Sequence, residues 1–177
     1  MSDIQSPMTP PDGADEFMLN DRSGYQSCFG CGAQNLAGLQ LVFHRQGEEI
    51  WAEYTPEERF QGFPGVLHGG VLATMLDETL SRAAVFAGQW MMTARLEVRY
   101  RRAAPLGRPL RVSARPTRVR AKTVSARGAV VLADEPEIIL AEAEGVFLPV
   151  SPNYERSLVA ERPELASFFQ HREATGR

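Results

Sequence analysis

The alternation of apolar and polar residues along the chain predicts an α+β fold. Period-two apolar spacing over residues 39–43 and 50–55 predicts two strands joined by a turn near Gly47. Residues 67–87 are apolar on nearly every side, which predicts one long buried helix that ends at Gly88. Beyond this helix, apolar residues alternate in four more segments that predict antiparallel strands: Leu96/Val98/Tyr100, Leu110/Val112/Ala114, Val124/Ala126 and Ile138/Leu140.

These elements predict one domain over residues 28–150, in which a curved antiparallel sheet holds a single long helix. Residues 1–27 contain scattered prolines and glycines and favour an irregular leader, with a short helix near residues 16–19. Residues 151–177 predict a helical tail, with one helix or two shorter ones over residues 158–171 around Pro163.

Length and composition limit the number of cores, the membrane association and the compartment that we expect for this chain. With 177 residues and 44% apolar content, the chain is large enough for one hydrophobic core. It has no apolar run of roughly 18 residues, and its polar start over residues 1–16 is not a signal peptide. Cys28 and Cys31 are too close in sequence to join distant segments and fit a reducing compartment. We therefore expect no membrane span and a cytoplasmic location.

A glycine pair at the start of the long helix and an acid two turns into it give the strongest chemical signal. The first N–H groups of a helix lack internal partners and attract negatively charged oxygen, and Gly69 and Gly70 allow another molecule to approach them closely. Asp77 lies among apolar residues, where a carboxylate is costly unless it is paired or functional. It serves chemistry at this site, or it reaches solvent at the helix edge or caps a neighbouring element.

The distance between Gly69 and Asp77 along the helix has a consequence for the number of chains in one site. The eight residues from Gly69 to Asp77 span about 12 Å along a helix, so one reacting carbonyl cannot touch both. Two antiparallel helices related by a two-fold axis would bring the glycine N–H of one chain to the acid of the other. If both groups act on one carbon, the spacing therefore predicts a dimer.

These residues form part of a wider motif. His68-Gly69-Gly70 is followed by Leu76-Asp77-Glu78 and preceded by Cys28-Phe29-Gly30-Cys31-Gly32 and Gly38-Leu39. The motif resembles the hotdog-fold acyl-CoA thioesterases, in particular their PaaI-like branch, from about residue 28 to about residue 149. The resemblance implies a curved antiparallel sheet wrapped around one long central helix. It also implies a thioester hydrolase that acts on a small or medium acyl-CoA without a cofactor.

The resemblance also assigns roles to individual residues. It implies that the Gly69 N–H polarises the thioester carbonyl and that Asp77 is the catalytic carboxylate, as general base or as nucleophile. Thr93, which begins the next predicted strand, matches the residue that places the attacking water, and His68 matches a histidine that shapes the same corner. In this family the glycine and the acid of one site come from different subunits, which implies an obligate homodimer and allows a dimer of dimers.

Substrate contacts are expected around the glycine pair and along the strands. Gln61 is the nearest match to a polar residue that the family has before the glycine pair, although residues 62–65 intervene. Residues 95–127 carry many arginines and one acid, Glu97, so some arginines suit the phosphates of coenzyme A, while most fit the solvent face of strands. The substrate-binding residues that we expect are Gly70, Gln61, Phe63, Met75, Arg95 and Arg120. The acyl group and its carrier, coenzyme A or acyl carrier protein, stay open.

Other functions receive less support. Cys28 and Cys31 have the spacing of half a zinc site, but no second such pair follows and only His44, His68 and His171 could add ligands, so we expect no metal. A redox role would need a strand-to-helix context that is missing. Aromatic residues do not interleave with the arginines beyond Tyr100, so no nucleic-acid partner is expected. The main alternative is a hotdog protein that binds acyl-CoA or an acyl chain without cleaving it.

Overall fold

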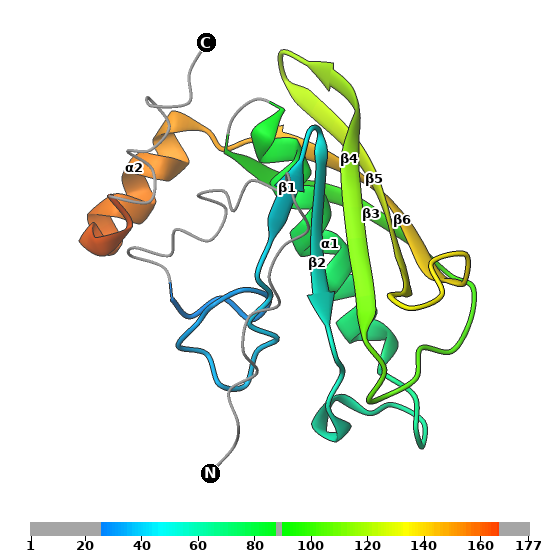
Figure 1. Cartoon of the computed structure of the whole chain (residues 1–177). Coiled ribbons are helices and arrows are strands. Elements are labelled where there is room, and N and C mark those ends of the chain that lie inside the picture. Colours follow the sequence, from blue (N-terminus) through cyan, green and yellow to red (C-terminus); the bar gives the residue numbers. More distant parts are fainter. Residues whose placement is uncertain (1–25, 88–89, 167–177) are drawn as a thin grey trace.

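One six-stranded antiparallel sheet curves around helix α1 in the computed structural model of the chain, which describes residues 26–87 and 90–166 (Figure 1). The strand order in the sheet is β1-β2-β4-β5-β6-β3. The strands are β1 (His44–Gln46), β2 (Glu49–Tyr54), β3 (Met91–Tyr100), β4 (Leu110–Arg120), β5 (Thr123–Leu132) and β6 (Ile139–Pro149). The predicted α+β architecture, with four strands after the helix, is confirmed.

The first hairpin differs from the prediction. Gly47 forms the turn with φ of +60°, as the sequence indicated, but the strand before it is β1, and residues 39–43 are not a strand. Their apolar alternation has another cause. The N–H groups of Leu39 and Leu41 donate to the carbonyls of Phe29 and Gly30, so this segment pairs with the preceding loop while its apolar side chains enter the core.

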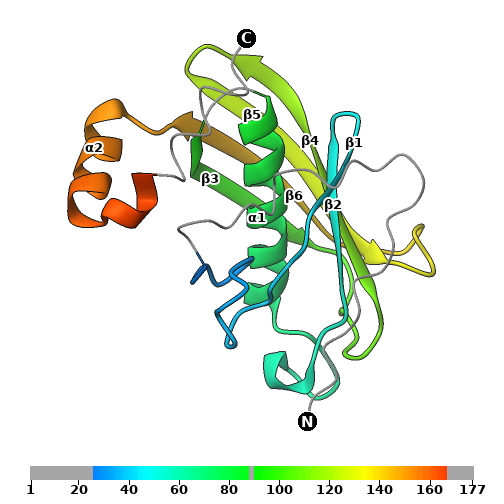
Figure 2. The same cartoon turned by 60° about the vertical axis from the view of Figure 1, so that its left-hand side comes forward.

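Helix α1 (Gly69–Phe86) lies across the inner face of the sheet (Figure 2). Its buried face includes Leu72, Met75, Leu76 and Leu80, which pack against apolar residues of β2, β4, β5 and β6. The opposite side of the helix is half-buried rather than buried, and it carries Asp77. The predicted stop at Gly88 lies outside the described residues. The sheet thus covers one side of α1 and leaves its acid within reach of a ligand or a second chain.

Three shorter helical segments complete the described chain: η2 (Glu58–Phe60), α2 (Pro152–Glu161) and η3 (Pro163–Leu165). Ser151 caps α2 by accepting a hydrogen bond from the N–H of Tyr154 at 3.2 Å. The helix in the tail therefore begins at Pro152, earlier than the predicted residue 158. The end of the predicted helix over residues 167–171 and the leader over residues 1–25 lie outside the described residues. Among the helices that the structure describes, none is long and apolar enough to cross a membrane.

Gly128 offers a test of how tightly the central strands pack. A Cβ at this residue would lie 2.5 Å from the main-chain oxygen of Ser113 on β4 and 3.0 Å from the Cβ of Ala114. Because main-chain atoms of a central strand cannot rotate away, we expect Gly128→Ala to lower the free energy of unfolding by about 1–3 kcal/mol. Urea denaturation would measure the change. Ser125→Ala on the outer face of β5 is the control, and equal stability of the two variants would contradict this packing.

Candidate active site

The start of α1 leaves one backbone donor available. His68 precedes the helix, and its Nδ1 accepts a hydrogen bond from the N–H of Gly70 at 2.9 Å. The carbonyl of Gly69 accepts a hydrogen bond from the hydroxyl of Tyr100 at 2.9 Å. Over residues 26–87 and 90–166, the N–H of Gly69 has no protein acceptor. A helix start with a free N–H stabilises negative charge on an oxygen that approaches it.

Tyr100, at the end of β3, is a site residue that sequence reasoning missed. Its ring carbons would lie 3.4 Å from a Cβ at Gly69, so any larger residue there would crowd the ring. The alternation of Leu96, Val98 and Tyr100 with polar residues predicted a strand. It did not predict that the Tyr100 hydroxyl holds the start of α1. Tyr100 therefore helps to explain why glycine occupies the first residue of the helix.

Two turns further along the helix, Asp77 meets Thr93. The Thr93 hydroxyl donates a hydrogen bond to Oδ1 of Asp77 at 2.8 Å. Burial raises the pKa of Asp77 above its ordinary value, and the neighbouring charge of Glu78 adds to the rise, whereas the Thr93 hydrogen bond opposes it. The structure thus brings together the two residues to which the resemblance assigned the activation and placing of water.

A β-bulge in β3 directs the Thr93 side chain toward α1. Thr93 pairs with Phe147 and Arg95 pairs with Val146, so Ala94 is an extra residue in β3. If the same residues, Ala94 included, formed a regular strand without a bulge, strict alternation would place Thr93 on the same outer face as Arg95 and Glu97. The bulge turns its hydroxyl toward Asp77 instead.

The remaining predicted contacts are not gathered around Asp77. Oε1 of Gln61 accepts a hydrogen bond from the N–H of Gly65 at 2.7 Å, which holds the loop before α1. Phe63 on this loop is 81% exposed, whereas Met75 is 0% exposed and belongs to the core. Within one chain, Phe63 is therefore open to a ligand and Met75 presents no surface to one.

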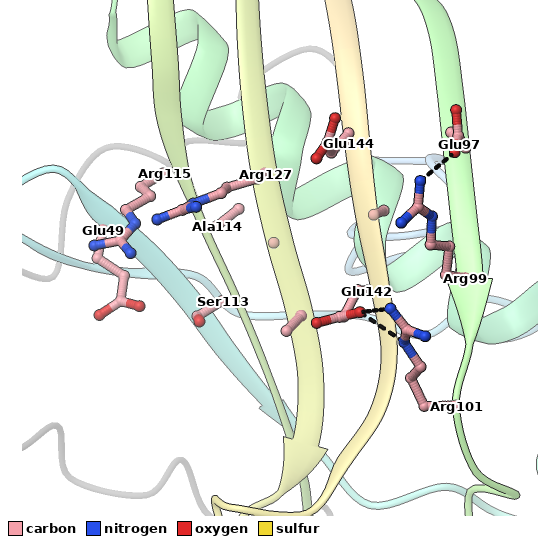
Figure 3. A pocket seen from close by; sticks show the side chains of 13 residues that line it. Glu49, Glu97, Arg99, Arg101, Ser113, Ala114, Arg115, Arg127, Glu142 and Glu144 are labelled. Carbon is pink, nitrogen blue, oxygen red and sulfur yellow. Dashed lines mark hydrogen bonds and ion pairs between the residues drawn. The ribbon is translucent and has the colours of Figure 1, made fainter.

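The arginines lie mainly on the solvent face of the sheet, as the alternation predicted. Arg95 and Arg99 form ion pairs with Glu97 at 2.9 and 3.1 Å, and Arg120 is exposed near the end of β4. A cavity of about 500 Å³ lies over the outward-facing side chains of β3 to β6 (Figure 3). Arg101 and Glu142, 2.7 Å apart, lie within it. The arginines therefore stand apart from Asp77, on the other face of the sheet from α1.

Comparison with known proteins adds independent information on the family. Residues 64–139 match the family model described as the thioesterase superfamily, a segment that holds the glycine pair, Asp77 and Thr93. A bovine protein named acyl-coenzyme A thioesterase THEM4 is 32% identical over 139 residues, which is 77% of this chain and 57% of that protein. The matches cover 30% to 57% of the curated relatives' own lengths, so the chain spans about half of them or less.

Solved structures give the same result for the fold. A crystal structure of a thioesterase superfamily protein has a TM-score of 0.65 and 28% identity, and the match covers 81% of this chain and 73% of that one. The PaaI protein of E. coli has a TM-score of 0.59 and 15% identity, with 64% of this chain and 81% of that chain covered. Residues 64–139 therefore match the thioesterase superfamily, and the described chain has the hotdog fold of these solved structures.

Proposed function

We propose that the chain hydrolyses the thioester bond of an acyl-CoA with a small or medium acyl group, giving the free acid and coenzyme A. The observation that carries the proposal is the 2.8 Å hydrogen bond between Thr93 and Asp77, on a helix whose first residue keeps a free N–H. A general base, a hydroxyl beside it and an oxyanion donor are the groups that acyl transfer to water requires. The bovine relative that bears the name of an acyl-CoA thioesterase supports this substrate class.

The mechanism follows from these groups. Asp77 takes a proton from a water molecule held beside the Thr93 hydroxyl, and the water oxygen attacks the thioester carbon. The Gly69 N–H stabilises the negative oxygen of the tetrahedral intermediate. When the C–S bond breaks, the proton held by Asp77 goes to the departing thiolate of coenzyme A. The raised pKa of Asp77 makes its carboxylate a stronger base than an exposed one.

One active site needs two copies of the chain in this proposal. Among the described residues, strand β3 is the last strand of the sheet, is 10 residues long and has no strand on its outer edge, whereas the opposite edge strand β1 has only 3 residues. A long unpaired edge is a template for another strand. Antiparallel pairing of two β3 strands would continue the sheet across both copies and set their α1 helices side by side.

The contacts of α1 with β3 support one position for the two-fold axis of the proposed dimer. Asp77 meets β3 at Thr93, and Gly69 meets it at Tyr100, so the midpoint between the two groups lies near Glu97. An axis there would place Thr93 of each chain near Tyr100 of its partner. The Gly69 N–H of one chain would then face the Asp77 carboxylate of the other, across the gap that one helix cannot close. Arg95 and Arg99 flank Glu97 and would balance its charge at the axis.

The outer face of the sheet supports a dimer of dimers. Arg115, Arg127, Glu144 and Glu97 are in register across β4, β5, β6 and β3, which gives a row of two positive and then two negative side chains. Figure 3 shows all four of these side chains around the cavity that they line. A second sheet related by a two-fold axis parallel to the strands presents the same row reversed, so opposite charges face each other.

The substrate contacts and the compartment are part of the same proposal. Arg120, for which the described chain offers no carboxylate partner, is available to a phosphate of coenzyme A, and Arg95 would have to leave Glu97 to reach one. Phe63 and Met75 would line the acyl site only where a second chain or a rearrangement completes it. No cofactor takes part in these steps. The two free thiols fit a reducing compartment, and we propose the cytoplasm.

The alternative, binding of acyl-CoA without cleavage, makes a different prediction in one assay. Purified protein is incubated with a panel of short-, medium- and long-chain and aromatic acyl-CoAs, and a thiol reagent reports free coenzyme A. Release in proportion to enzyme supports hydrolysis, and the preferred chain length identifies the substrate. Saturable binding without release would replace the proposal with the binding function.

Replacing Asp77 tests the assignment of the base. We expect Asp77→Asn to lower kcat by about 10²- to 10⁴-fold, because the amide cannot accept a proton from water. Circular dichroism and gel filtration should show an unchanged fold and oligomer, since the amide keeps the size of the carboxylate. A wild-type kcat in this variant would contradict the proposed role of Asp77 as the base.

Replacing Thr93 should change the pH dependence of the activity. Because the Thr93 hydrogen bond lowers the pKa of Asp77, Thr93→Val should raise that pKa further. The base works ionised, so activity of the wild type should fall as the pH drops through a pKa above the ordinary aspartate range, and in Thr93→Val this fall should move to higher pH. We also expect Thr93→Ala to lose less activity than Asp77→Asn. An unmoved pH profile together with unchanged kinetics would remove Thr93 from the site.

A crosslink at the proposed axis tests the dimer. Residues opposite each other in antiparallel strands have Cβ atoms about 4.5–5.5 Å apart, which is close to disulfide geometry. We expect Glu97→Cys to form a disulfide-linked dimer on mild oxidation, visible on non-reducing gels. Ser125→Cys, on central strand β5, should stay monomeric on the same gel. A monomer by light scattering, or no crosslink of Glu97→Cys, would contradict the shared site.

A further inference from the structure

The loop over residues 26–41 carries the two cysteines, and it lies against the middle of α1 (Figure 2). Sγ of Cys28 lies 3.3 Å from Oε1 of Glu78, and the sulfurs of Cys28 and Cys31 and a carboxylate oxygen of Glu78 all lie within 4.8 Å of one another. Neither this loop nor Glu78 contributes a group to the hydrolysis steps above. The cluster therefore needs a separate explanation.

We propose that Cys28, Cys31 and Glu78 bind a zinc ion that fastens this loop to α1. The sequence offered only half of a metal site, because the third ligand comes from a residue 50 positions away from Cys28. The fold supplies it. The inference stands on these three side chains and does not depend on the proposed hydrolase activity.

The spacing of the donors suits one tetrahedral ion. Zinc lies about 2.3 Å from cysteine sulfur and about 2.0–2.2 Å from carboxylate oxygen, so two of its ligand atoms are roughly 3.5–3.8 Å apart. The distance of 3.3 Å between Cys28 and Glu78 is close to this value. All three donors fit one coordination sphere after small side-chain rotations, which leaves the fourth position for water.

The loop backbone is shaped to present the Cys28 sulfur. A Cβ at Gly30 would overlap the Glu78 side chain, so a larger residue here would push the carboxylate away from its present position against the loop. The N–H of Gly32 closes the turn by donating to the carbonyl of Cys28 at 2.9 Å.

The surrounding charge also fits a divalent cation. Two thiolates and a carboxylate would repel one another in this half-buried cluster, and a divalent ion would leave one net negative charge. Arg82 lies 3.5 Å from Glu78 and can neutralise that charge, while its guanidinium packs over the ring of Phe43 at 4.3 Å. A disulfide between the cysteines would make no use of the carboxylate, which favours metal over redox chemistry here.

Cobalt and zinc binding to the reduced full-length chain tests the site. The protein is reduced, stripped with a chelator and titrated with Co²⁺, which gives a thiolate-to-cobalt charge-transfer absorption, and then with Zn²⁺, which displaces it. We expect one ion per chain. Cys28→Ser, Cys31→Ser and Glu78→Gln should each raise the Kd for Co²⁺ by at least about tenfold, since loss of outer-shell partners alone costs 10- to 100-fold.

Asp77→Asn is the matched control, because it removes the neighbouring carboxylate and should leave the Kd for Co²⁺ unchanged. Should a cysteine variant fail to fold, Glu78→Gln, which keeps the size of the side chain, still decides the result. The inference is overturned if the reduced wild type takes up no metal, or if Glu78→Gln binds Co²⁺ as tightly as the wild type does. It is also overturned if intact mass shows that the two cysteines form a disulfide and that the protein then binds no ion.

Discussion

The antiparallel packing of α1 along β3 is the constraint on which the rest of this molecule depends. It fixes two contacts at once, the Tyr100 hydroxyl on the carbonyl of Gly69 and the Thr93 hydroxyl on the carboxylate of Asp77. The buried leucines of α1 hold the helix in the sheet and so keep both contacts in place. Because the helix is rigid, the oxyanion donor and the base stay two turns apart, and this separation is what makes a second chain necessary in the proposed mechanism.

Local patterns in the sequence predicted the parts of this fold that local physics decides. The four strands after α1 follow from alternation, and the helix follows from its apolar stretch. The strand predicted over residues 39–43 is wrong because the same alternation also arises where apolar side chains enter the core from a loop. Period two reports which side chains are buried, and it does not report what the backbone pairs with.

The long-range contacts could not be read from the sequence in the same way. Tyr100 reaches Gly69 across 31 residues, and Glu78 reaches Cys28 across 50, and no periodicity encodes either contact. The proximity of Thr93 to Asp77 was expected only through the resemblance to the hotdog thioesterases. Half of the candidate metal cluster was visible as the spacing of two cysteines, and its third member required the fold.

The extra residue in β3 has a consequence for how this surface can evolve. Ala94 shifts the phase of the strand, so that Thr93 belongs to the inner face while Arg95, Glu97 and Arg99 keep the outer one. Substitutions in the outer charges can therefore remodel contacts between copies without touching the hydroxyl beside Asp77. Deletion of Ala94 would leave Thr93 paired with Phe147 and Arg95 paired with Val146, so it would remove the bulge and keep both side chains on their present faces.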